Sequence, residues 1–254
     1  MALLIFVTSD SISKPRLLWE AGIVVALSIG QSALYSVLSF IRSLMTAPLS
    51  QQATSLNPSR SDQAVWDAIY RLLDIAFDLA MVALVLYLLW EPARSAFERI
   101  GLNFSRFGRD VGTAVALLAC IGIPGLALYA VSRLAGLTLQ VQASELDAAW
   151  WTIPLLIFSA LRAGLLEEVI LNGYLIEKLS RVWKPWQVLA AVAVLRGLYH
   201  LYQGPAMAAG NMVMGLVFGL VYLKWRRAMP LVIAHTLLDT VAFVGYPLAA
   251  PFLP

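Results

Sequence analysis

Charged residues are scarce in this sequence. Only 13% of its 254 residues are Asp, Glu, Lys or Arg, whereas soluble domains carry roughly a quarter. Hydrophobic residues make up 60% of the chain, and they gather in runs long enough to cross a bilayer. The composition therefore excludes an ordinary soluble domain and indicates an integral membrane protein. It gives no support to nucleic-acid binding, because Lys and Arg lie in short clusters between the apolar runs.

Several common chemical patterns are absent as well. The single cysteine, Cys120, excludes an intrachain disulfide and a metal site built from cysteines. No HExxH motif occurs, so the helical zinc-protease pattern is unsupported. Neither a GxGD-type aspartyl pair nor a GxSx nucleophile with a partner histidine is evident. Three frequent designs of intramembrane protease are thus missing.

The apolar runs predict an all-α fold, a polytopic transmembrane helical bundle with about seven to eight spans. Helices are expected because an open strand edge would leave backbone groups unpaired in lipid. The polar stretch from Thr46 to Asp62 is expected to be a loop. The predicted spans are approximately residues 18–41, 66–90, 111–132, 150–180, 185–203, 206–223 and 229–249.

Basic residues cluster between alternate pairs of spans. One set comprises Lys14, Arg16, Arg94, Arg99, Arg106, Arg109, Lys178, Arg181, Lys184, Lys224, Arg226 and Arg227. The positive-inside rule places this set, and the N-terminus, in the cytoplasm. No small-residue cleavage site follows the first apolar run, so we expect a retained helix. The compact chain favours a bacterial plasma membrane, and the sequence predicts no oligomeric state.

Ionisable side chains inside the apolar runs are the main candidates for function, because a charge there costs a few kcal/mol and usually faces the bundle interior. Both histidines of the chain are among them. The spacing of Arg71, Asp74 and Asp78 predicts a structural ion pair within one helix. The other members are Arg162, Glu167, Glu168, Arg196, His200, His235 and Asp239.

Depth along the helices brings several of these side chains together. Glu167 and His200 each lie about 16 residues from the turn that joins their spans, or about 25 Å at roughly 1.5 Å per residue. Asn211 reaches a similar depth. Asp239 lies about 18 Å along its helix from the basic turn that precedes it, and His235 lies one helical turn closer to that basic turn. We therefore predict one polar pocket within the membrane, formed by Glu167, Glu168, His200, Asn211, His235 and Asp239.

Such a pocket indicates amide hydrolysis. A carboxylate beside a histidine, shielded from bulk water, can act as a general base on a water molecule. Glu167 and Glu168 project about 100° apart on a helix, so we expect one to face the pocket and the other to pair with a cation. Oxyanion donors could come from His235 and Asn211. No cofactor is expected, although a metal held by both glutamates and both histidines is chemically possible.

Three short motifs occur in order in the late spans: EEVILNGYL, RGLYH and HTLLD. They resemble the EExxxR, FxxxH and His-x3-Asn/Asp motifs of the CAAX-protease and bacteriocin-processing (CPBP, or Abi) intramembrane glutamic endopeptidases. The resemblance covers about residues 150–245. It implies a catalytic helical core in residues 150–254, preceded by N-terminal transmembrane helices and loops in residues 1–149. It also implies a membrane-associated protein or peptide substrate, prenylated substrates included, and no catalytic metal.

The resemblance also implies roles. Glu167 would be the general base with His200 as its partner, while His235 and Asp239 would shape the oxyanion site. A non-catalytic membrane scaffold or immunity protein of the same fold is the first alternative. A proton-coupled transporter is the second, since buried Glu and His also form proton relays. An inverted repeat would favour the transporter, and none is evident.

The chain departs from the family pattern at two positions. Asn172 stands where the first motif has Arg, and Arg196 stands where the second has Phe. Each lies about 12 residues from the same turn, so the two positions share a height. We predict that the missing guanidinium comes from the neighbouring helix, with Arg196 paired to Glu168. The departures also leave room for a member that has lost proteolysis.

Overall fold

The structure, a computed structural model, describes residues 13–142 and 149–249 and confirms the all-α membrane bundle. Its helices are α1 (Lys14–Leu27), α2 (Ile29–Thr46), α3 (Ala64–Leu89), α4 (Ala96–Arg99), α5 (Phe107–Leu134), α6 (Thr152–Glu167), α7 (Ile176–Leu179), α8 (Pro185–Tyr199), α9 (Pro205–Trp225), α10 (Met229–Thr240) and α11 (Tyr246–Ala249). The π-helical segments η3 (Glu168–Leu175) and η5 (Val241–Gly245) continue α6 and α10. Short 3-10 turns are η1 (Leu49–Gln51), η2 (Phe104–Arg106) and η4 (Leu201–Gln203).

Every predicted span coincides with a helical segment. Among the described residues, four helices are long and apolar enough to cross a membrane: α3, the run from α4 through α5, α9, and the run from α10 into α11. α1 and α2 form a fifth span if they count as one, broken by a bend of 54°. α8 has 15 residues and is shorter than a usual span. The segment from α6 through α7 carries Arg162, both pocket glutamates, Glu177 and Lys178, which lowers its apolar character.

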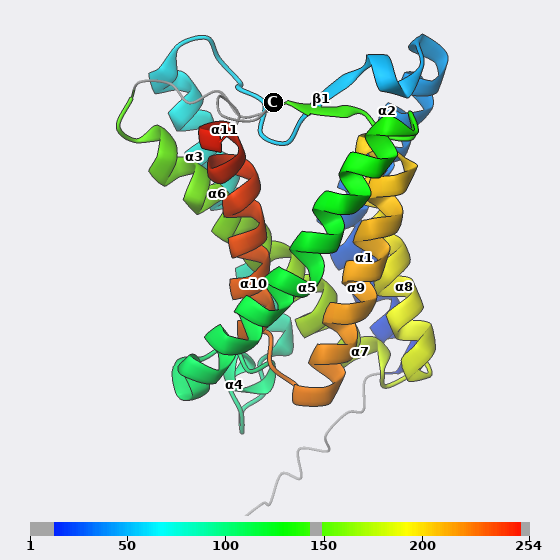
Figure 1. Cartoon of the computed structure of the whole chain (residues 1–254). Helices are drawn as coiled ribbons and strands as arrows, with labels where there is room; N and C mark the ends of the chain where they lie inside the picture. Colours follow the sequence, from blue (N-terminus) through cyan, green and yellow to red (C-terminus); the bar gives the residue numbers. More distant parts are fainter. Residues whose placement is uncertain (1–12, 143–148, 250–254) are drawn as a thin grey trace, which may run out of the picture.

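Two short strands were not predicted. β1 (Ala53–Ser55) pairs in parallel with β2 (Gln140–Gln142). β1 lies within the polar stretch expected to be a loop, between α2 and α3, and β2 follows α5. The pair joins two connections at one end of the bundle (Figure 1). Strands of three residues are too short to produce a recognisable alternation of polar and apolar side chains.

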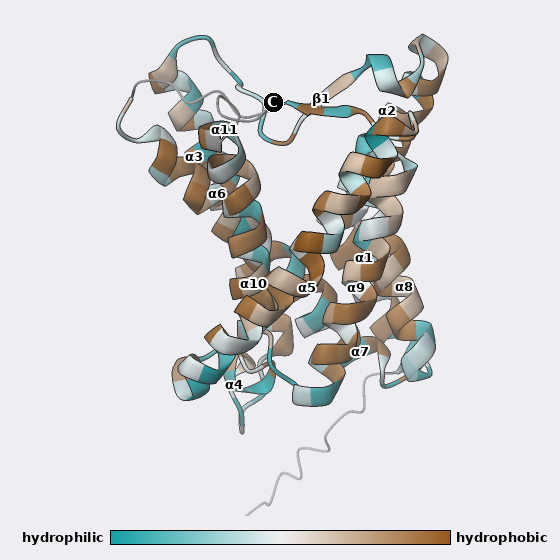
Figure 2. Cartoon of the chain, in the orientation of Figure 1, coloured by the Kyte–Doolittle hydropathy of each residue, from teal (hydrophilic) through white to brown (hydrophobic). Residues whose placement is uncertain are grey.

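The helices form two groups that diverge toward the end carrying β1 and α11 (Figure 1). One group contains α3, α6 and α10, and the other contains α1, α2, α8 and α9. α5 packs against both α9 and α10 and so connects the groups. Outward faces are rich in apolar residues (Figure 2), including exposed Phe77, Ile123 and Leu220. Such faces suit contact with lipid.

The predicted basic clusters lie at one end of the bundle. The start of α1, the connection containing α4, the α7–α8 turn and the α9–α10 turn all meet there (Figure 1). This is the end opposite β1 and α11. The arrangement agrees with one cytoplasmic face under the positive-inside rule.

A buried ion pair fixes the α9–α10 turn at this basic end. Arg226 ends α9 in the left-handed conformation with φ of 51°. The next residue, Arg227, donates from Nη2 and Nε to Asp110 of α5 at 2.5 and 2.9 Å. It also donates to the backbone oxygen of Asn103 at 3.0 Å. One side chain therefore holds the turn against the beginning of α5.

Replacing Arg227 with Met should destabilise the protein strongly. Asp110 is only 3% exposed, and a buried charge that loses its partner costs about 3–5 kcal/mol. The control is Arg226→Met, because Arg226 is half exposed beside Glu177 and exposed pairs contribute about 0–1 kcal/mol. Thermal unfolding in detergent should rank the variants in this order. Equal losses of thermal stability in the two variants would contradict the role assigned to the buried pair of Arg227 and Asp110.

Candidate active site

The two adjacent glutamates lie where an α-helix becomes a π-helix. Glu167 is the last residue of α6, and Glu168 is the first residue of η3. π-helical turns are rare and occur frequently at functional sites. All eight residues of η3 are buried. The change of helix type therefore coincides with the polar cluster inside the bundle.

Glycines allow the surrounding helices to approach. A Cβ at Gly164 would lie 2.7 Å from Thr236 Oγ1, so α6 and α10 cross closely beside the glutamates. A Cβ at Gly215 would lie 3.1 Å from Ala193 Cα and 3.3 Å from Arg196 Cδ. Gly215 belongs to the GxxxG pattern on α9, which favours close packing. Because Gly215 has no side chain, the Arg196 side chain can occupy the space beside it.

Glu168 is fully buried and has several hydrogen-bond partners. Its Oε1 accepts from Arg196 Nη1 at 2.8 Å and from His235 Nδ1 at 2.8 Å. Its Oε2 accepts from Asn172 Nδ2 at 2.6 Å. The predicted pair between Arg196 and Glu168 is thus confirmed, with Asn172 as a second donor. Both carboxylate oxygens are engaged, so Glu168 is placed to organise the site rather than to react.

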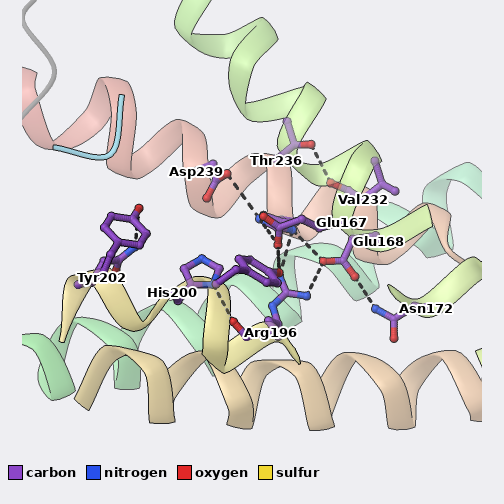
Figure 3. Close-up of polar contacts among 12 residues, drawn as sticks. Glu167, Glu168, Asn172, Arg196, His200, Tyr202, Val232, Thr236 and Asp239 are labelled. Atoms are coloured by element: carbon purple, nitrogen blue, oxygen red, sulfur yellow. Dashed lines mark hydrogen bonds and ion pairs between the residues drawn. The ribbon is translucent and has the colours of Figure 1, made fainter. Parts of the chain in front are cut away.

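Arg196 connects the two glutamates. Its side chain is fully buried, and Nη2 lies 3.3 Å from Glu167 Oε2. Nη2 also lies 3.1 Å from His235 Nδ1, but that nitrogen cannot accept from Arg196 while it donates to Glu168. The carboxylates and the guanidinium converge in Figure 3. The cation therefore lies within reach of both acidic groups.

Glu167 is the more accessible glutamate. Its side chain is 15% exposed, compared with 0% for Glu168. Tyr199 donates its hydroxyl to Glu167 Oε2, which leaves Oε1 available to another group. Tyr199 was missed by the sequence analysis, although it immediately precedes His200 in the RGLYH motif. Of the two glutamates, Glu168 makes the closer pair with Arg196, at 2.8 Å compared with 3.3 Å for Glu167.

His200 presents one ring nitrogen to the site. Its Nδ1 lies 3.1 Å from the backbone oxygen of Arg196. Donation to this carbonyl requires the tautomer with the proton on Nδ1, so Nε2 is left as an acceptor. The ring lies beside that of Tyr199, with centroids 4.5 Å apart. In Figure 3, His200 lies between Tyr202 and the glutamates.

His235 and Asp239 form the third side of the cluster. They are four residues apart on α10, and His235 Nε2 lies 3.5 Å from Asp239 Oδ2 and 3.7 Å from Glu167 Oε2. Since Nδ1 faces Glu168, Nε2 is the nitrogen that faces Glu167. Asp239 is 23% exposed along its side chain. The ring nitrogen and this carboxylate therefore lie at the accessible edge of the cluster.

Asn211 donates to the backbone oxygen of Met207 in its own helix at 3.0 Å, and its place in the pocket stays a prediction. One predicted set of ion-pair partners was wrong. In the second predicted span, Arg71 pairs with Asp67 at 2.6 Å, not with Asp74 or Asp78. Two further pairs, Asp74 with Arg60 and Asp78 with Arg162, reach outside that helix. Helical spacing alone did not identify these partners.

The cluster fits a metal ion poorly. Ligand atoms of Glu167, Glu168 and His235 lie within 4.8 Å of one another, a spacing that could serve a cation. The guanidinium of Arg196 lies 2.8 Å from Glu168 and 3.3 Å from Glu167, however. It already supplies positive charge there and would repel a divalent ion. The geometry thus argues against the metal-bound alternative.

Comparison with known proteins places this site in a family. The family model for type II CAAX prenyl endopeptidase, Rce1-like, matches residues 149–241. No curated protein and no solved structure gives a significant match. The matched segment covers less than half of the chain but contains all three motifs and every residue of the cluster. Over this segment the chain is similar to the Rce1-like family of type II CAAX prenyl endopeptidases.

Proposed function

We propose that the protein is an intramembrane endopeptidase that cleaves a peptide bond in a membrane-associated protein or peptide. The observation that carries this proposal is the inequality of the two glutamates. Glu168 is buried and fully paired, while Glu167 is partly exposed beside two histidines. A reactive carboxylate held by a buried ionic framework suits general-base catalysis in a site shielded from bulk water.

Glu167 and His200 would activate the attacking water. Oε1 of Glu167 takes a proton from water as the water oxygen bonds to the carbonyl carbon of the substrate. His200 Nε2 accepts the second water hydrogen in a hydrogen bond and fixes the orientation of the lone pair. Glu167 then returns the proton to the amide nitrogen, and the C–N bond breaks to release an amine and a carboxylic acid. The atoms and protons of this reaction therefore balance without a further reactant.

His235 would stabilise the oxyanion. Because Nδ1 donates to Glu168, Nε2 donates to the oxygen that becomes negative during attack when the ring is in its doubly protonated, imidazolium form. Asp239, at 3.5 Å from this nitrogen, orients the ring before substrate enters. Asp239 can donate to an oxyanion itself only when protonated. Arg196 supports the same step indirectly, because its charge offsets the two neighbouring carboxylates.

Removing either group that activates water should abolish cleavage. We expect Glu167→Gln and His200→Ala to lower the rate by about 10²–10⁴-fold, the usual contribution of a general base. The control is Glu98→Gln, an exposed carboxylate at the basic end. The assay incubates purified protein with a membrane-peptide library and identifies products by mass spectrometry. A chelator should leave the wild-type rate unchanged if no metal takes part.

Different outcomes would support different functions. Equal cleavage by wild type and both variants would contradict the assigned mechanism. A library that stays uncut by the wild type would favour a membrane scaffold or immunity protein. A response to an imposed pH gradient would favour the transporter.

Moving the guanidinium back to the first motif should rescue the site. Arg196→Phe leaves the fully buried Glu168 without its cation and should cost about 3–5 kcal/mol of stability. Adding Asn172→Arg places a new guanidinium four residues after Glu168, where helical neighbours meet. We expect the double variant to regain thermal stability and cleavage relative to Arg196→Phe. If it does not, Arg196 is no substitute for the motif arginine.

Tyr199→Phe should slow catalysis without weakening substrate binding. The change removes one hydrogen bond to a charged acceptor, about 1.5–3 kcal/mol, or roughly 10–100-fold in kcat. Tyr202→Phe is the matched control, because the hydroxyl of Tyr202 accepts from Gln203 at 3.0 Å and makes no contact with Glu167. Steady-state kinetics should show a lower kcat and an unchanged KM for the first variant. A change confined to KM would instead assign Tyr199 to substrate binding.

A further inference from the structure

The chain reverses its direction immediately after His200. This residue is the C-cap of α8, and the turn η4 begins at the next position. Gly204 ends η4 with a φ of 109°, and α9 starts directly after it. The backbone oxygen of His200 accepts from the amide of Gln203 at 3.1 Å. Because the His200 backbone is thus part of the turn, the position of its ring depends on what holds η4.

Three hydrogen bonds from earlier segments of the chain hold η4. Ser36 of α2 accepts from the backbone amide of Tyr202 through Oγ at 2.8 Å. Thr138, in the connection between α5 and β2, donates its hydroxyl to the backbone oxygen of Gln203 at 2.5 Å. The amide of the residue after Thr138 donates to the same oxygen at 3.2 Å. Ser36 and Thr138 are both buried, so water does not readily replace either hydroxyl.

The connection that carries Thr138 is itself held in place. Arg133 donates from Nη1 to the backbone oxygen of Thr138 at 3.0 Å and to that of Ser50 at 3.3 Å. A Cβ at Gly204 would lie only 2.9 Å from Thr138 Cα. Glycine therefore lets the two backbones meet, and it also adopts the positive φ of this position without strain. The turn after His200 is thus in direct backbone contact with the α5–β2 connection.

We propose that Ser36 and Thr138 are positioning residues for His200. By holding η4, they fix the backbone that carries the imidazole, so that Nε2 points at the water activated by Glu167. The family match over residues 149–241 contains neither of the two hydroxyls, so the site is completed by segments that lie outside the matched region. The effect on catalysis rests on the proposed function, whereas the placement of the ring does not.

Removing the Thr138 hydroxyl tests this assignment by kinetics. Thr138→Val keeps the shape of the side chain and loses the donor, so we expect a kcat lower by about 10- to 100-fold with an unchanged KM, since a misplacement of about 1 Å can cost about 100-fold. Thr138→Ser keeps the donor and should restore kcat. Ser36→Ala loosens the same turn from α2, so the test does not depend on one variant. The matched control is Thr46→Val, because that hydroxyl bonds within the exposed end of α2.

Histidine NMR measures the placement of the ring without proteolysis. The chain has only two histidines, so full-length protein labelled at histidine, and purified through a tag free of histidine, gives two sets of ring signals. His200→Ala identifies which set belongs to His200. We expect Thr138→Val and Ser36→Ala to shift or broaden the His200 signals while those of His235 stay in place. Thr138→Ser should return the His200 signals to their wild-type positions.

The two measurements together decide the proposal. Unmoved His200 signals in both Thr138→Val and Ser36→Ala would overturn it. A shift of both histidines, or an equal loss of kcat in Thr138→Val and Thr138→Ser, would also overturn it, because either result indicates a general loss of structure. A selective shift of His200 in a protein that cleaves no peptide would reject the proposed function while leaving the positioning of the ring intact.

Discussion

The guanidinium of Arg196 is the group on which the rest of the site depends. A fully buried cation is costly unless charges and hydrogen bonds surround it. Here Glu168 binds it at 2.8 Å, Glu167 lies at 3.3 Å, and the ring of Phe218 lies 5.3 Å away, within the range of a cation–π contact. Because these partners come from α6, η3 and α9, one side chain of α8 fixes the relative positions of several helices. His235 joins them from α10 through the same carboxylate.

This framework explains how two adjacent glutamates acquire different properties. Asn172, Arg196 and His235 engage both oxygens of Glu168, so that carboxylate has no free acceptor site of good geometry. Glu167 keeps one oxygen free because Tyr199 and Arg196 approach only the other. The family pattern places arginine on the same helix as the glutamates, whereas this chain brings it from the next helix. In this chain the guanidinium beside Glu168 therefore comes from α8.

The sequence predicted neighbouring residues correctly where height along the helix axis was sufficient to identify them. Spans follow from apolar length, and the constant rise per residue placed Arg196 at the height of Glu168. Reasoning failed where rotation about the helix axis decides the partner. Asp78 pairs with Arg162 of a neighbouring helix, not with Arg71 of its own helix. Tyr199 escaped notice because tyrosine is common in membrane helices and carries no charge to mark it.

The helices converge at the basic end of the bundle because ion pairs join them there. At the basic end, Arg227 binds Asp110, Lys178 binds Glu20 at 2.6 Å, and Arg226 binds Glu177 at 2.6 Å. These pairs join the α9–α10 turn to α5, α7 to α1, and the end of α9 to α7, so the helices converge there. At the other end, η1, β1 and β2 form the connections, and the helix groups diverge (Figure 1). The ion pairs at the basic end therefore account for the convergence of the helices there.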